Sequence, residues 1–256
     1  MTVSSLPGVY EAPEWRSMPD GMLRPGGLAL TDRALAHCGL PAGSRVWDVG
    51  CGMGATVAHL IAVHGLAAVG GDRSEGTLAA ARVRTPWLPL LCARGDALPC
   101  ATGALDAVIA ECAWSSIAGG SGAAGRSGAA GRPGAGRTGR DGFLAECARV
   151  LRPGGWLIVS DVYARTAASL PRAPMGAGCW QTLPTEGQVK GAVTAQGFAV
   201  ELWEDHSAAL REFAARMIFE HGSLRPLWGE AGERPEARAA LAAARPGYFL
   251  LVARRD

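Results

Sequence analysis

The chain has 256 residues, of which 48% are hydrophobic and 19% are charged, and its formal net charge is +2 at pH 7. This length suits one α/β domain with a well-buried core, so we expect a single domain over residues 1–256. The arginines form no stripe interleaved with aromatic residues, which argues against a nucleic-acid partner. No apolar run approaches the ~20 residues that cross a bilayer, and the first residues lack an apolar signal core. We therefore expect a cytoplasmic protein without membrane contact, either a monomer or a homodimer.

The seven cysteines contain no C-x-x-C pair, and their number is odd. In a reducing compartment most of them would be small buried hydrophobic residues. The sequence therefore predicts no structural zinc site and no other metal site.

The N-terminal segment is rich in proline and glycine as far as residue 27. Residues 28–40, LALTDRALAHCGL, have the pattern of a helix capped near Thr31. We interpret residues 1–30 as a lid segment.

A short apolar run, an acid and a glycine-rich turn fill residues 45–60, RVWDVGCGMGATVAHL. The pattern predicts a buried strand, a sharp turn and a helix over residues 55–64, whose N-terminus would face an anionic group. It fits both the dinucleotide motif G-x-G-x-x-G/A and the methyltransferase motif [D/E]-x-G-x-G-x-G. Asp48 favours the second, because it would repel a pyrophosphate but accept hydrogen bonds from the ammonium group of S-adenosylmethionine (SAM).

Two further acids follow at predicted strand ends. The segment LAAVGGD reads as a second strand that ends at Asp72, where a carboxylate can accept hydrogen bonds from ribose hydroxyls. A helix over TLAAARVRT and a strand at 88–92 come next. In the loop after that strand, Asp96 is placed to bind an adenine amino group.

The segment LDAVIAECAWSSI predicts a fourth strand running to Glu111 and Cys112. They would lie at the carboxyl edge, where open α/β sheets bind ligands. Residues 118–141 are a Gly/Ala/Arg/Ser-rich tract and are expected to form a flexible loop. The remaining predicted elements are a helix at 142–151, a strand over WLIVSDV, strands at 198–207 and 248–255, and helices at about 208–221 and 235–244. Residues 165–246 would form the substrate side of the domain.

Together the motifs VWDVGCGMG, Asp72, GDALP, DAVIAEC and RVLRPGGWLIVSD resemble the class I SAM-dependent methyltransferases of the type 11 group, over about residues 30–165. The resemblance implies a Rossmann-like α/β fold with a seven-stranded sheet in the order 3-2-1-4-5-7-6, strand 7 antiparallel and helices on both faces. It also implies one SAM per site, with S-adenosylhomocysteine as product. The implied cofactor-binding residues are Asp48, Gly50, Cys51, Gly52, Gly54, Asp72, Arg73, Gly95, Asp96, Ala97, Glu111 and Cys112.

The leading functional hypothesis is methyl transfer from SAM to a small-molecule nucleophile. The candidate catalytic residues are His206, Glu111 and Cys112, and the candidate substrate-binding residues are Tyr163, Cys179 and His221. A partial resemblance to arsenite methyltransferases leaves open a metalloid or thiol methyltransferase that uses Cys112 and Cys179. Two more functions are compatible with the glycine motif, namely an NAD(P)-dependent oxidoreductase and a noncatalytic SAM-binding protein.

Overall fold

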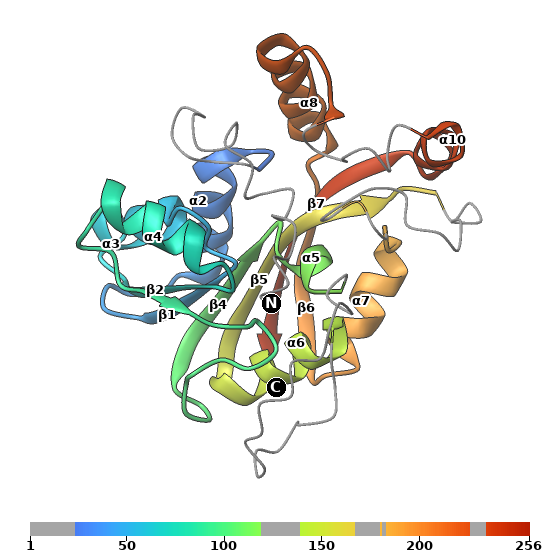
Figure 1. Ribbon diagram of the computed structural model, residues 1–256. Coiled ribbons are helices and arrows are strands. Elements are labelled where there is room, and N and C mark those ends of the chain that lie inside the picture. The colour runs from blue at the N-terminus through green and yellow to red at the C-terminus, as the bar shows by residue number, and fades with distance from the viewer. Residues whose placement is uncertain (1–23, 119–138, 167–179, 181–182, 226–233) are drawn as a thin grey trace, which may run out of the picture.

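The computed structural model describes residues 24–118, 139–166, 180, 183–225 and 234–256. Its sheet has seven strands in the order β3-β2-β1-β4-β5-β7-β6 (Figure 1). The strands are β1 (Arg45–Val49), β2 (Ala67–Asp72), β3 (Leu90–Cys92), β4 (Leu105–Glu111), β5 (Leu151–Ala164), β6 (Phe198–Asp205) and β7 (Pro246–Arg255). Strand β7 runs antiparallel to both of its neighbours, whereas the pairs among β1 to β5 are parallel. The predicted fold is therefore confirmed.

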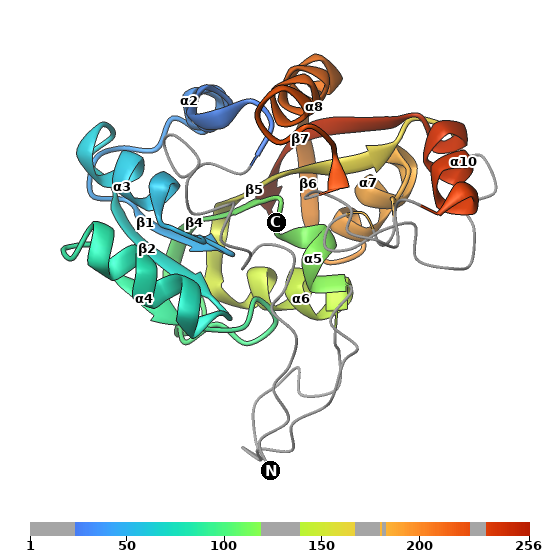
Figure 2. The same cartoon turned by 45° about the horizontal axis from the view of Figure 1, so that its top comes forward.

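Helices cover both faces of this sheet (Figures 1 and 2). They are α2 (Gly27–Cys38), α3 (Ala55–Ala62), α4 (Glu75–Arg84), α5 (Trp114–Ala118), α6 (Gly139–Val150), α7 (Glu186–Thr194), α8 (Ser207–His221) and α10 (Pro235–Ala244). None of the helices in the described ranges is both long enough and apolar enough to cross a membrane.

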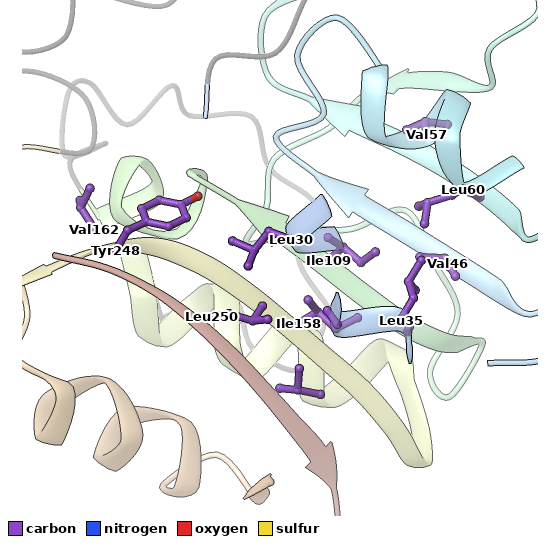
Figure 3. Packing of buried hydrophobic residues seen from close by; sticks show 14 of the residues in the cluster. Leu30, Leu35, Val46, Val57, Leu60, Ile109, Ile158, Val162, Tyr248 and Leu250 are labelled. Atoms are coloured by element: carbon purple, nitrogen blue, oxygen red, sulfur yellow. The ribbon is translucent and has the colours of Figure 1, made fainter. Parts of the chain in front are cut away.

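The sheet has one hydrophobic core on each of its two faces. Because side chains alternate along a strand, Tyr248 and Leu250 of β7 enter one core, and Phe249 enters the other. The first core packs against α2, α3 and α4, and Figure 3 shows Tyr248 and Leu250 within it. The second core packs against α5, α6 and α7. Because β1, β2 and β4 run parallel, their carboxyl ends lie at the same edge of the sheet.

The predicted cap of the first helix is wrong. Helix α2 begins at Gly27 after Gly26, and both glycines have positive φ angles (52° and 77°). Thr31 lies inside the helix, only 1% exposed. Its hydroxyl is bonded to Arg24 and Glu111, so it is not available to cap the helix.

Helix α7 is missing from the elements predicted from the sequence. It begins with a capping box in which Thr185 and Gln188 satisfy each other's backbone N–H groups. The spacing T-x-x-Q is the sequence signal that indicates this helix. Most of the predicted lid and of the 118–141 loop, and Cys179, lie outside the described residues.

Candidate active site

The glycine turn between β1 and α3 forms the floor of the candidate site. Gly50, Gly52 and Gly54 have φ angles of 73°, 53° and 80°, a region that favours glycine. The N–H groups of Gly50 and Cys51 both donate to the carbonyl oxygen of Gly71, at 2.7 and 3.2 Å. This fixes the turn against the end of β2. A Cβ on Gly52 would meet no atom within 4 Å, so its backbone borders open space.

Asp72 connects this turn to the next helix. Its Oδ2 accepts a hydrogen bond from the Gly52 N–H at 3.0 Å, and its Oδ1 accepts one from the Ser74 N–H at 2.9 Å. Arg73 beside it is exposed. The acid therefore lies at the mouth of the turn, with its orientation set by the backbone on both sides.

Asp48 is the buried acid of the site. Its exposure is 3%, and no donor in the described part of the chain forms a hydrogen bond with its carboxylate. Burial raises the pKa of Asp48 to about 7, and the negative charge of Asp72 adds to this, while Arg24 opposes it. Such a carboxylate is suited to a cationic ligand, because a nearby positive charge would stabilise its ionised form.

Asp96 lies in the loop after β3. Arg94 donates two hydrogen bonds to its carboxylate, at 2.8 and 2.7 Å. The Arg94 side chain is 67% exposed. Gly95 permits close packing here, since a Cβ at that position would lie 2.7 Å from Ile117 and 3.0 Å from Val49. Ala97, the next residue after the acid, is exposed.

Glu111, the last residue of β4, holds the N-terminal helix over the site. Its two carboxylate oxygens accept hydrogen bonds from the hydroxyls of Thr31 and Thr56, both at 2.8 Å. It also forms an ion pair with Arg24, and both side chains of this pair are less than 10% exposed. Burial lowers the pKa of Arg24. The carboxylate thus joins α2, α3 and β4.

Cys112 follows Glu111 and has a φ angle of 53°, in the region that few non-glycine residues adopt. Its Sγ lies 3.2 Å from the Tyr248 hydroxyl, which is also 3.1 Å from Ser160 Oγ. Burial raises the pKa of Tyr248 well above its usual value. Tyr248 is therefore a neutral phenol, and Figure 3 shows its hydroxyl pointing away from the β7 backbone.

The comparisons with known proteins agree with this geometry. The sequence model of a family described as "Methyltransferase domain" matches residues 47–159, from the first strand to the fifth. Residues 47–159 therefore resemble a methyltransferase domain, and the order of the sheet is the one expected of class I SAM-dependent methyltransferases. A search of curated proteins gave no match.

Solved structures similar to this chain include the [4+2]-cyclase SpnF, at 25% identity over 89% of this chain and 80% of that one, with a TM-score of 0.60. The cyclopropane synthase MmaA2 from Mycobacterium tuberculosis is 14% identical over 97% and 96% of the two chains, with a TM-score of 0.66. Phosphoethanolamine N-methyltransferase 2 from Haemonchus contortus, solved with phosphomonomethylethanolamine and S-adenosylhomocysteine, is 16% identical with a TM-score of 0.63. The alignment spans 96% of this chain but only 56% of that enzyme's length. The last two likenesses show the fold alone.

The predicted cofactor residues gather at one sheet edge, around the turn, Asp72 and the end of β4. His206 contacts none of these residues through its side-chain hydrogen bond. Its Nε2 is 2.9 Å from Glu204, which also pairs with Arg33 of α2. His221 ends α8, whereas His206 precedes it. A helix of this length separates the two histidines by about 20 Å.

Tyr163 faces away from Cys112. Its ring packs edge-on against Trp203 and Phe249 in the second core, with centroids 5.4 and 5.9 Å away. Burial raises the pKa of Tyr163 to about 12, and the nearby Asp205 adds to this. Tyr163 therefore lies on the opposite face of the sheet from Tyr248.

Sequence reasoning missed Thr31, Thr56, Ser160 and Tyr248 as site residues. Thr56 lies in the first turn of α3, directly after the glycine turn, and this position was its only sequence signal. Ser160 and Tyr248 meet because β5 and β7 are adjacent, Ser160 pairing with Leu250 in the register. That adjacency depends on the long-range order of the sheet.

Proposed function

We propose that the protein transfers a methyl group from SAM to a small-molecule nucleophile. The observation that carries the proposal is Asp48, a buried carboxylate without a hydrogen-bond donor in the described residues, beside a glycine turn that borders open space. The ammonium group of SAM would supply both the charge and the donors. The neighbour from H. contortus, which contains S-adenosylhomocysteine, supports the cofactor assignment.

The residues of the turn would hold the cofactor along the carboxyl edge of the sheet. Asp48 would bind the ammonium group, Asp72 the ribose hydroxyls, and Asp96 with the Ala97 N–H the adenine. For this, Arg94 would have to share or release Asp96, and its exposed side chain permits that. SAM supplies an electrophilic methyl group, so the protein's main task is to align a nucleophile with it and exclude water.

The acceptor side of the proposed site is the cluster of Cys112, Ser160 and Tyr248. Glu111 is already engaged by Arg24 and two hydroxyls, so the structure favours a positioning role for it over that of a general base. Because Tyr248 is neutral, it would act as a hydrogen-bond donor that orients the acceptor. Arsenite belongs among the acceptors to be tested, since Cys112 lies in this cluster.

Replacing Tyr248 by Phe removes one hydroxyl and keeps the ring. We expect the free energy of unfolding to fall by about 1–3 kcal/mol, since the buried Ser160 hydroxyl loses this hydrogen-bond partner. SAM affinity should remain unchanged, while the rate of methyl transfer to an identified acceptor should fall. Thermal unfolding, calorimetry with S-adenosylhomocysteine and turnover measurements would check the three expectations. A variant with normal turnover would exclude Tyr248 from the acceptor site.

Cofactor binding is the first test of the proposal itself. Calorimetry with SAM, S-adenosylhomocysteine, NAD⁺ and NADP⁺ should give binding of the two SAM-related ligands only. Asp72→Asn should weaken that binding about 10-fold, because charge-assisted hydrogen bonds contribute roughly 1.5–3 kcal/mol. Glu212→Gln, on an exposed face of α8, is the matched control and should bind normally. Binding of NAD(P) alone would overturn the proposal in favour of an oxidoreductase.

Methyl transfer needs its own assay, because the relative SpnF is named as a [4+2]-cyclase. Release of S-adenosylhomocysteine in the presence of thiols, amines, hydroxyl compounds or arsenite would support the proposed activity. Tight SAM binding without turnover on any of these classes would instead favour a noncatalytic SAM-binding protein.

A further inference from the structure

Three side chains outside the cofactor site converge on one point between α2 and α3. Asp32 Oδ1 lies 2.5 Å from His59 Nε2 and 2.7 Å from His64 Nε2. One ligand atom from each residue lies within 4.8 Å of the others. The sequence-based expectation of no metal site rested on cysteine spacing, which does not bear on this cluster.

The end of α3 brings the two histidines together. Residues five apart in a continuous helix point about 140° away from each other, so His59 and His64 would not share a face. The helix ends at Ala62, and Val63, with a φ angle of -100°, leads the chain out of the helix before His64. As a result the two imidazole rings meet edge to face, with centroids 5.0 Å apart.

The two histidines of the cluster are partly buried, whereas its aspartate is exposed. The side chains of His59 and His64 are 13% and 28% exposed, whereas that of Asp32 is 46% exposed. A hollow of about 170 Å³ adjoins the cluster, and Asp32 and His64 form part of its lining. The carboxylate therefore has room to move, and water molecules have room to complete a coordination shell.

We propose that Asp32, His59 and His64 bind a divalent transition-metal ion of the zinc type. Imidazole and carboxylate ligands suit Zn²⁺, Co²⁺, Ni²⁺ and Cu²⁺, and three protein ligands leave positions for water. Metal–ligand bonds are about 2.0–2.2 Å long, so the distances from Asp32 Oδ1 to the two histidine Nε2 atoms would have to increase by roughly 1 Å. The exposed carboxylate of Asp32 can move by this amount. Each histidine would bind the ion through Nε2 and keep its proton on Nδ1.

The ion would fasten α2 to α3 on the outside of the molecule. On the inside, the residue next to Asp32, Thr31, is already joined to Thr56 of α3 through Glu111. Metal binding would therefore stabilise the packing of the N-terminal helix on the helix that follows the glycine turn. The proposal does not depend on the reaction that the enzyme catalyses.

Zinc titration of the full chain without an affinity tag tests the site. Calorimetry should give one Zn²⁺ per chain, and the midpoint of thermal unfolding should be higher in Zn²⁺ than in EDTA. Asp32→Asn and His64→Gln should each weaken binding at least about 10-fold, since each replaces a carboxylate or imidazole ligand by a weakly coordinating amide, and even indirect supports of a metal site contribute about 10–100-fold. Both side chains are partly exposed, so these variants should fold. His37→Gln is the matched control, because His37 also lies 3.6 Å from an acid, Glu201.

Cobalt distinguishes this cluster from the cysteines. The Co²⁺ complex should show visible d–d bands without a thiolate charge-transfer band, and Cys92→Ser should leave them unchanged. Absence of saturable binding would overturn the proposal. Unchanged binding in His59→Gln/His64→Gln, or a spectrum dominated by thiolate, would also overturn it.

Discussion

Replacing Asp48 by Asn should stabilise the cofactor-free protein while it weakens SAM binding. At pH 8 the wild-type carboxylate is ionised, 3% exposed and without a hydrogen-bond donor in the described residues. The pKa shift from the usual value to about 7 corresponds to a cost of roughly 4 kcal/mol at most, which the neutral amide avoids. Loss of the ion pair with the ammonium group should weaken SAM binding about 100-fold.

The destabilising effect of ionised Asp48 should appear in the pH dependence of the free energy of unfolding. Between about pH 4 and pH 7 the folded protein holds a proton on Asp48 that the unfolded chain has lost. The free energy of unfolding should therefore fall as pH rises through this range and level off above pH 7, as far as this group is concerned. The Asn variant should lack this slope. SAM affinity should change in the opposite direction, rising with pH as Asp48 ionises.

Asp161→Asn is the matched control for burial. Asp161 is fully buried too, and burial also raises its pKa, but Ser115 and the Val162 N–H donate hydrogen bonds to it. Its amide variant should lose stability, because it weakens satisfied hydrogen bonds at the start of α5. Denaturant unfolding from pH 5 to pH 8 would measure the stability of the wild type and of both variants, and calorimetry would measure their affinity for SAM. If Asp48→Asn destabilised the protein as Asp161→Asn does, Asp48 would be a structural acid.

The proposed cofactor side could be predicted from the sequence because its parts are local. The strand, the acid and the glycine turn are contiguous, and Asp72 lies one βα unit further along. The order of the sheet followed from a family resemblance, and the structure confirms it. Helix α2 shows the limit of local reasoning, since the hydroxyl of Thr31 suits a helix cap in sequence but is used by Glu111, 80 residues away.

The proposed acceptor side could not be predicted because long-range packing assembles it. Cys112 and Tyr248 are separated by 136 residues, and they meet only because β7 inserts next to β5. Tyr163 illustrates the same dependence: its position just past the predicted strand suggested the substrate pocket, but alternation along β5 directs it into the second core. A strand's two faces cannot be assigned until its neighbours are known.

Gly50→Ala and Gly52→Ala should separate the two tasks of the glycine turn. Both positions have positive φ angles, so alanine is strained at either one, by about 1–3 kcal/mol. At position 50 the new methyl group would also lie 2.7 Å from the Ala113 Cβ, so backbone must move and the stability loss should be larger. At position 52 it would meet no protein atom within 4 Å.

The methyl group of Gly52→Ala would instead occupy the open space that we assign to SAM. We therefore expect this variant to keep most of its stability yet lose S-adenosylhomocysteine binding by at least about 10-fold, whereas Gly50→Ala should lose both together. Thermal unfolding and calorimetry on the two variants provide the comparison. Normal binding by Gly52→Ala would place the cofactor elsewhere. The sequence motif does not distinguish Gly50 from Gly52, and only the atoms that surround each glycine predict different effects of the two substitutions.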